Sequence, residues 1–168
     1  PADTVPSIGV VRVSGDSNYP PYEFIDEHGN PAGFNVDIFR AVADVMGIES
    51  TISLGPWDVV RSNLENGSID MLLGMFYSEE REKLVDFSQP HLTVTHSLFV
   101  RINSDITSLD DIPGKTVIVQ KGDIMHDYLK ENHVDANIYP VASQVEGLRL
   151  LASGKYDSFL GAKLQGLL

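Results

Sequence analysis

The sequence predicts an α/β fold, because three features recur along the chain. Short runs rich in apolar residues, at 50–54, 69–73 and 116–119, have the length expected of strands buried in a parallel sheet. Segments with apolar residues three or four positions apart follow such runs and predict amphipathic helices. Clusters of Gly, Pro, Asn and Asp separate these segments. Alternating strands and helices are typical of α/β architecture.

The first half is predicted to begin with a strand at 8–13, and residues 22–25 precede a turn signal. A turn at 26–31 then leads to a helix with Asn35 as its expected N-cap and Gly47 at its end. The expected inward face of this helix consists of Ile38, Phe39, Val42, Val45 and Met46.

Strand 50–54 precedes a helix at 57–64, and strand 69–73 precedes a helical turn at 78–81. Residues 91–101 predict a long strand. The expected inward residues of the helix are Trp57, Val60 and Leu64.

The second half repeats the pattern after a polar connector. We expect strands at 116–119 and 136–140 and a further strand from Asp157. Two helices are expected, one capped by Asp123 and one at 143–152. The inward residues of the latter are expected to be Val145, Leu148 and Leu151.

Composition limits the function classes. The 168 residues are 42% hydrophobic, enough for a globular core, and carry a net charge of −12, which disfavours binding to nucleic acid or anionic membranes. No cysteine is present, so disulfide and thiolate chemistry are excluded. No apolar run reaches the roughly 18 residues that span a bilayer. The polar start does not have the pattern of a signal peptide, and we expect that any such peptide precedes this chain.

Arg81 stands out within residues 74–90, just after an apolar strand. A guanidinium that is partly buried needs an anionic partner, and its planar fork suits a carboxylate. The residues alone leave a simpler alternative open, in which Arg81 is exposed and pairs with Glu80 or Glu82.

Several motifs occur in one order: 19–24 (YPPYEF), 29–30 (GN), 33–38 (GFNVDI) and 74–90 (GMFYSEEREKLVDFSQP). In this order the chain resembles the type II periplasmic solute-binding proteins, which include bacterial extracellular solute-binding protein family 3. That group contains amino-acid receptors of ABC transporters and the Venus-flytrap sensor domains of membrane histidine kinases and cyclases.

The resemblance implies a periplasmic-binding-protein-like II fold of two lobes, each a sheet flanked by helices, with a ligand cleft between them. Residues 1–93 would form the first lobe and residues 94–168 an incomplete second lobe. Members of the family return to the first lobe at their C-terminal end. That return is missing from these residues, which we expect to be part of a longer record or protein.

Ligands of open α/β sheets bind at the carboxyl ends of the strands, which places the loops after the strands at a shared cleft. The candidate ligand-binding residues are Asp16, Tyr19, Trp57, Gly74, Met75, Phe76, Arg81, Asp123, Ile124 and Met125. The resemblance implies that Arg81 grips a ligand carboxylate and that the carbonyl of Gly74 receives an amino group. It also implies that Asp16 meets a basic ligand side chain and that Tyr19 and Trp57 sandwich the ligand. Tyr22 and Tyr77 are expected to be structural.

The chain departs from the family pattern at three positions. Phe76 replaces a hydroxyl residue, Asp123 and Ile124 replace a Ser-Thr pair at a helix start, and Ala162 stands where an acid usually holds the ligand's amino group. A carboxylate at Asp123 would occupy the helix amides that otherwise bind an anion. A carboxylate-bearing ligand is still expected through Arg81, while a standard α-amino acid is left open.

We therefore expect an extracytoplasmic module that closes on a carboxylate-bearing ligand, as the sensor domain of a transmembrane signalling protein. An ABC-transporter receptor is the alternative, and a cyclohexadienyl-dehydratase-like enzyme with Asp123, Lys121 or His126 as acid or base is the alternative from another class. Enzymatic activity is not expected.

No cofactor and no metal are expected, because the histidines lack a ligand cluster at metal spacing. The expected partner is a small molecule, not nucleic acid. We expect the module to lie in the periplasm or on the extracellular face of the cytoplasmic membrane. A membrane tether would lie outside this chain, and a dimer is expected only in a full-length receptor.

Overall fold

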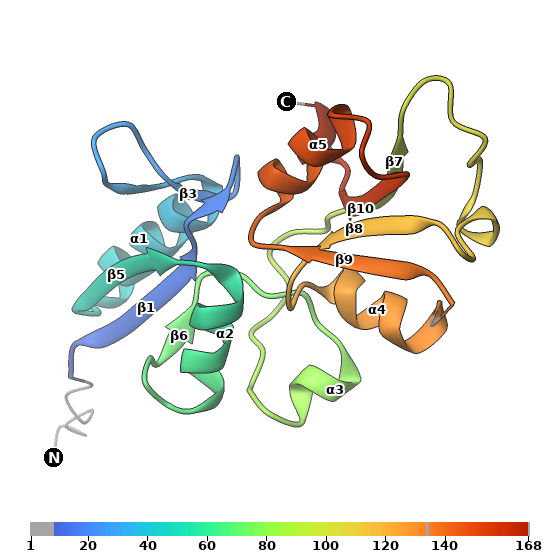
Figure 1. Ribbon diagram of the computed structural model, residues 1–168. Coiled ribbons are helices and arrows are strands. Elements are labelled where there is room, and N and C mark those ends of the chain that lie inside the picture. Colours follow the sequence, from blue (N-terminus) through green and yellow to red (C-terminus); the bar gives the residue numbers. More distant parts are fainter. Residues whose placement is uncertain (1–8, 134, 168) are drawn as a thin grey trace, which may run out of the picture.

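The computed structural model describes residues 9–133 and 135–167 and shows two lobes (Figure 1). The first lobe runs from strand β1 to helix α3 and the second from strand β7 to the C-terminal 3₁₀ turn η2. The connection between them has no regular secondary structure.

A parallel sheet in the order β5-β1-β6 forms the centre of the first lobe. Its strands are β1 (Val11–Asp16), β5 (Ser50–Gly55) and β6 (Met71–Leu72). A small antiparallel sheet beside it consists of β2 (Asn18–Tyr19), β3 (Glu23–Ile25) and β4 (Pro31–Ala32). The helices are α1 (Phe34–Met46), α2 (Trp57–Glu65) and α3 (Glu79–Glu82).

The second lobe has a four-stranded sheet in the order β7-β10-β8-β9, in which only β7 pairs antiparallel. Its strands are β7 (His96–Val100), β8 (Thr116–Gln120), β9 (Asn137–Val141) and β10 (Ser158–Ala162). The helices are α4 (Ile124–Asn132) and α5 (Gln144–Ala152), with 3₁₀ turns η1 (Leu109–Asp111) and η2 (Leu164–Leu167).

Alternation along β8 gives this sheet two buried faces. Val117 and Val119 pack in the cluster that contains Leu129 of α4, whereas Ile118 packs in the cluster that contains Leu151 of α5. The two helices lie on opposite sides of the sheet (Figure 1). A strand covered on both faces is apolar throughout, which explains why the sequence predicted it well.

Helix α1 turns a different face to the core than the sequence predicted. Val36, Phe39 and Ala43 are buried against Val13 and Leu73, and Phe39 alone of the predicted inward set is fully buried. Val42, Val45 and Met46 are exposed. The reason is that backbone hydrogen bonds of Phe34 and Asn35 to Pro21 and Tyr22 fix the rotation of the first turn.

Three predicted strands differ in extent. The first begins at Val11 and runs to Asp16, and Ile8 lies outside the described residues. Of 69–73 only two residues pair as a strand, and of 91–101 only His96–Val100. The amides of Asp70 and Leu73 still donate to the carbonyls of Arg12 and Ser14 in β1, although only the residues between them count as a strand. Residues 91–95 belong to the connection between the lobes, which has no regular secondary structure. The predicted boundary between 93 and 94 stays a prediction.

No helix in the described part of the chain is both long and apolar enough to cross a membrane. Within residues 9–133 and 135–167, no three His, Asp or Glu side chains gather where they could hold a metal ion.

Candidate functional site

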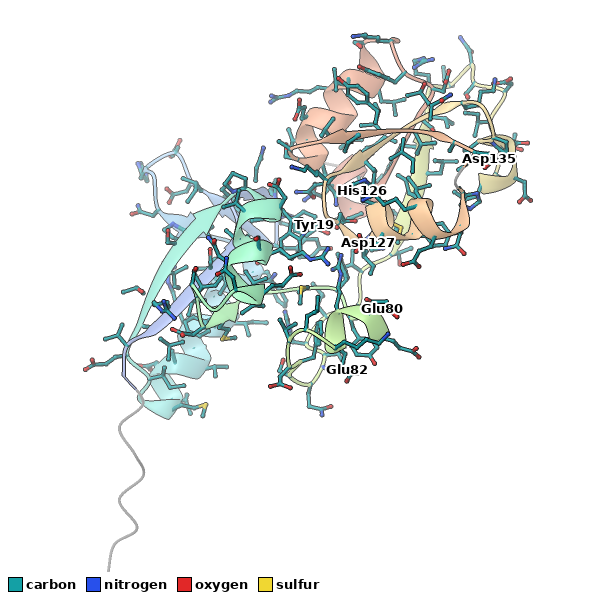
Figure 2. The ribbon with its side chains drawn as sticks, turned by 60° about the horizontal axis from the view of Figure 1, so that its bottom comes forward. Tyr19, Glu80, Glu82, His126, Asp127 and Asp135 are labelled. Carbon is teal, nitrogen blue, oxygen red and sulfur yellow. The ribbon has the colours of Figure 1, made fainter. Side chains whose placement is uncertain are left out.

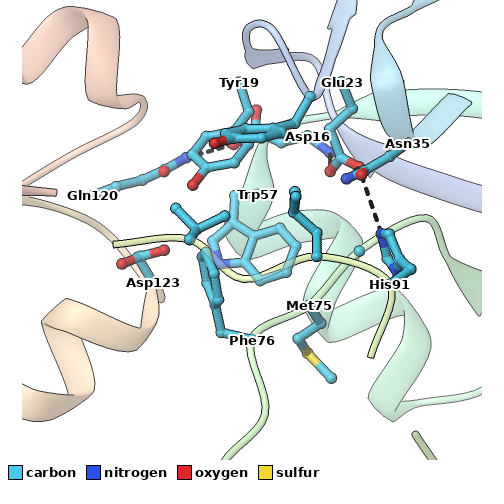
Figure 3. Close-up of a pocket in the computed structure, with 14 residues that line it drawn as sticks. Asp16, Tyr19, Glu23, Asn35, Trp57, Met75, Phe76, His91, Gln120 and Asp123 are labelled. Atoms are coloured by element: carbon cyan, nitrogen blue, oxygen red, sulfur yellow. Dashed lines mark hydrogen bonds between the residues drawn. The ribbon is translucent and has the colours of Figure 1, made fainter. Parts of the chain in front are cut away.

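A cavity lies between the two lobes, where the loops after β1, β5, β6 and β8 meet (Figure 3). Both lobes contribute to its wall. The residues that line it are Asp16, Tyr19, Tyr22, Glu23, Asn35, Trp57, Gly74, Met75, Phe76, His91, Leu92, Val94, Gln120 and Asp123. The carboxyl ends of parallel strands converge here, as the α/β architecture requires.

Asp16 and Glu23 form a buried acidic pair on the first-lobe side of the cavity. The Asp16 amide donates to Glu23 Oε1 at 2.7 Å, and Asn35 Nδ2 donates to Glu23 Oε2 at 3.0 Å. His91 Nε2 lies 3.2 Å from Asn35 Oδ1. Burial raises the pKa of Asp16 to about 6 and the pKa of Glu23 to about 7, because desolvation disfavours the charged carboxylates.

Asp16 also connects the two lobes. Gln120 at the end of β8 donates through Nε2 to Asp16 Oδ2 at 2.5 Å, and the Asn18 amide donates to Oδ1 at 2.8 Å. The carboxylate is thus held by neutral donors from both lobes.

Asp123 is the acidic residue on the second-lobe side. It is 5% exposed and caps α4, where its Oδ1 accepts the Met125 amide at 2.9 Å. Burial is the main influence and raises its pKa, while His96 and Arg81 act in the opposite direction. Figure 3 shows its carboxylate reaching toward the cavity from the second lobe.

Aromatic side chains form much of the remaining wall. Tyr19 and Tyr22 stack with ring centroids 5.3 Å apart, and Phe76 meets the ring of His96 edge-on at 4.8 Å. Trp57 Nε1 donates to the Gly122 carbonyl at 2.9 Å. The Tyr19 hydroxyl is buried and has no hydrogen-bond partner among the described residues.

Arg81 does not line the cavity. It is 2% exposed, and its Nη2 donates to Asp127 Oδ2 at 2.9 Å and to the Gly122 carbonyl at 3.2 Å, while Nη1 donates to the Phe76 carbonyl at 3.2 Å. Desolvation lowers its pKa, and the hydrogen bond to Asp127 opposes this. In Figure 2, Asp127 lies on α4 at the side that faces α3.

The exposed alternative for Arg81 is wrong. Glu80 instead pairs with Lys83 at 2.5 Å, and Glu82 accepts the Tyr77 hydroxyl at 2.6 Å. The buried Arg81 therefore has the carboxylate partner that its chemistry predicted, but this partner is the half-buried Asp127 from the second lobe of the same chain.

Further contacts join the lobes around Asp127. Arg61 on α2 donates through Nη1 to the Gly122 carbonyl at 2.9 Å and to Asp127 Oδ2 at 3.2 Å. Lys121 pairs with Asp58 at 2.7 Å. The loop before α4 is thus tied to α2 and α3 by charged side chains.

Most of the predicted site residues lie at the cavity, namely Asp16, Tyr19, Trp57, Gly74, Met75, Phe76 and Asp123. Arg81, Ile124 and Met125 are not among the lining residues. What each lining residue binds stays a prediction. Tyr22, expected to be structural, also lines the cavity.

Sequence reasoning missed Glu23, Asn35 and His91 as lining residues. Glu23 lies between Tyr22 and Phe24, and no local signal marks this acid as buried, because Glu is almost always exposed unless it is paired. Asn35 was interpreted as a helix cap, but Gly33 occupies that position and the Asn35 side chain turns to Glu23.

Comparison with known proteins places these features in context. Residues 11–137 match the family described as bacterial extracellular solute-binding proteins, family 3. A putative ABC transporter arginine-binding protein 2 from Escherichia coli (strain K12) is 29% identical over 152 residues, which are 90% of this chain and 62% of that protein. The chain thus spans about three fifths of the length of that relative.

Two solved structures are also similar. A histidine kinase sensor domain with similarity to periplasmic binding proteins is 39% identical, with a TM-score of 0.90, over 95% of this chain and 70% of that one. An ancestral amino acid-binding protein, a precursor of cyclohexadienyl dehydratase, is 30% identical with a TM-score of 0.84, over 95% and 73% of the two chains. Both are therefore similar over nearly the whole of the present chain.

Proposed function

The chain belongs to the bacterial extracellular solute-binding proteins, family 3, and on that basis we propose that it is a binding module that closes on a small, carboxylate-bearing ligand such as an amino acid. The observation that carries the proposal is the cavity between the lobes, whose wall includes Asp16 and Trp57 from the first lobe and Gln120 and Asp123 from the second. A ligand that contacts both lobes stabilises their closed arrangement.

The ligand carboxylate would bind Arg81 by exchanging with Asp127. The Arg81 guanidinium donates to the Phe76 carbonyl, and Phe76 lines the cavity. The guanidinium is therefore separated from the cavity by a residue that it contacts. A carboxylate from outside can replace an internal one at the same fork without leaving the buried charge unpaired.

We predict that Arg81→Ala weakens the binding of carboxylate ligands by 30-fold or more, on the order of the loss expected for a desolvated ion pair. Asp127→Asn should act in the opposite direction and strengthen binding several-fold, because the fork is then free. Titration calorimetry with a panel of amino acids measures both.

Lys83→Ala, which removes an exposed cation from the same segment, is the matched control and should bind as the unmodified protein does. Circular dichroism checks that each variant is folded. Unchanged affinity in folded Arg81→Ala would remove Arg81 from the site but would leave the cavity as the binding site.

We further propose that closure signals to a membrane kinase or cyclase. The similarity to a histidine kinase sensor domain supports this output, and the similarity to an arginine-binding protein of an ABC transporter supports the alternative of transport. The module would act in the periplasm or at the extracellular face, tethered through segments outside this chain and dimeric in the full receptor. The sequence of the whole gene would distinguish signalling from transport.

Enzymatic activity is not part of the proposal. The likeness to a dehydratase precursor makes this testable, because Asp123 lines the cavity and could act as an acid. Incubation with a cyclic carboxylic acid such as prephenate should give no product by liquid chromatography, and turnover that Asp123→Asn abolishes would replace the binding proposal with an enzyme.

A further inference from the structure

We propose that the cavity recognises a cationic group of its ligand, and that this ammonium binds between the Asp123 carboxylate of the second lobe and the Tyr19 hydroxyl of the first. This inference rests on the proposed function and adds the ligand class, an organic amine. If the ligand also has a carboxylate, that group would bind Arg81. Binding of the ammonium in the cavity does not require a carboxylate on the ligand.

The charge of the cavity is the first argument. Three carboxyl groups line it, those of Asp16, Glu23 and Asp123, and the lining residues include no Lys or Arg. In the described part of the chain none of the three forms an ion pair within 4.0 Å, although exposed acids such as Asp70 do. Ionising a buried carboxyl group costs free energy unless a cation pairs with it. A cationic ligand would be that partner.

The basic side chains near Asp123 have other interaction partners. Arg81 is held by Asp127 and two backbone carbonyls. Desolvation lowers the pKa of His96 and so disfavours its charged form, and its ring packs against Phe76. His91 contacts Asn35 at the far side of the acidic pair. None of these side chains compensates Asp123 by direct contact.

Asp123 differs from the other two acids in its partners. Asp16 and Glu23 each accept hydrogen bonds at both oxygens from neutral donors. Asp123 accepts the Met125 amide through Oδ1, a bond from the start of its own helix. Its carboxylate is therefore the one most available to a ligand.

Tyr19 is the second, independent observation. Its side chain lines the cavity, is only 8% exposed, and ends in a hydroxyl without a partner. A buried hydroxyl without a hydrogen bond destabilises the structure, and an ammonium N–H donated to its oxygen would supply the missing bond. Figure 3 shows Tyr19 above Trp57, with Asp123 entering from the opposite lobe.

Aromatic faces complete the environment of a cation. Tyr19, Tyr22, Trp57 and Phe76 all line the cavity. Cations bind favourably over such rings, and the rings also accommodate the apolar body of an amine. A ligand with an ammonium and an apolar or aromatic body fits this wall better than a simple dicarboxylate does.

The test compares three related compounds in two series. Phenylalanine, phenethylamine and 3-phenylpropionate share a body, as do lysine, 1,5-diaminopentane and hexanoate. Titration calorimetry and thermal shift at pH 8 measure each against the unmodified protein. We expect the amino acids and the amines of at least one series to bind, and the acids without an amine to bind at least tenfold more weakly.

Two variants test whether the ammonium binds between Asp123 and Tyr19. Asp123→Asn keeps a good N-cap while removing the charge, and Tyr19→Phe keeps the ring while removing the hydroxyl. We expect amine affinity to fall about tenfold or more in the first and about threefold or more in the second. Glu131→Gln, an exposed charge change on the same helix, is the matched control and should leave affinity unchanged.

The outcomes separate the two proposals. Acids without an amine that bind as tightly as the amines would overturn the cation inference, as would unchanged amine affinity in both folded variants, and either result would leave the binding function standing. Failure of all six compounds, and of a wider amine panel, to bind the folded protein would overturn both. Loss of folding in Asp123→Asn alone leaves Tyr19→Phe to decide.

Discussion

At the scale of single residues, the acidic pair of Asp16 and Glu23 makes folding depend on pH. Both pKa values are higher in the folded chain than in the unfolded one, where they are about 3.9 and 4.3. The folded state therefore binds more protons between pH 4 and pH 7. The stability that these groups contribute is fully present below pH 4 and is lost as pH rises through about 6 and 7.

We predict that Glu23→Gln reduces this loss. The free energy of unfolding of the unmodified protein should fall between pH 4.5 and pH 8 more steeply than that of the variant, by about 2–3 kcal/mol if the burial of Glu23 alone sets the difference. Urea denaturation at several pH values measures both curves. Parallel curves would show that Glu23 is not desolvated as the structure indicates.

At the scale of elements, the start of α1 is fixed by one glycine. Gly33 has φ of 113°, and a Cβ at this position would lie 2.5 Å from the Tyr22 carbonyl oxygen. This close approach ties the helix to the β2–β3 connection and sets which residues of α1 face the sheet. A side chain at Gly33 would have to break that contact.

Gly33→Ala is therefore expected to lower the free energy of unfolding by more than about 2 kcal/mol. Gly47→Ala, at the other end of α1, is the control: its φ is 65°, but nothing lies within 4 Å of the new Cβ, so the cost should be about 1 kcal/mol. Urea denaturation compares the two variants. Equal losses would mean that only the backbone conformation, and not the close approach, matters at Gly33.

At the scale of the whole molecule, the lobes are joined by side chains of the protein itself. Trp57, Arg61 and Arg81 of the first lobe all donate to the Gly122 carbonyl, and both arginines reach Asp127. Contacts of this kind favour the closed arrangement even before a ligand adds its own, and they set how much a ligand can shift the lobes.

We predict that Arg61→Ala opens the lobes when no ligand is bound. The chain has no cysteine, so Cys substitutions at Glu27 and Asp110, exposed residues of the two lobes, would carry a specific pair of fluorophores. Energy transfer should fall in Arg61→Ala and recover with ligand. Arg40→Ala, an exposed arginine of the first lobe, serves as control. Equal transfer in both variants would show that the contacts of Arg61 do not hold the lobes together.

The sequence alone determined the α/β class, the order of most elements and half of the residues that line the cavity. This succeeded because local signals are sufficient for such features: the β8 strand is apolar because both its faces are covered, and Trp57 and Asp123 begin helices directly after strands. The family resemblance, confirmed by comparison, supplied the two lobes.

Only the tertiary structure decided which charges meet. That Arg81 needs a carboxylate follows from its chemistry, but the identity of that carboxylate, Asp127, which is 46 residues away in sequence, depends on how the two lobes dock. Likewise, Glu23 became part of the cavity and Val42 of the surface through contacts between elements that no local pattern encodes. Helix periodicity specifies an apolar stripe, whereas packing selects the face that is buried.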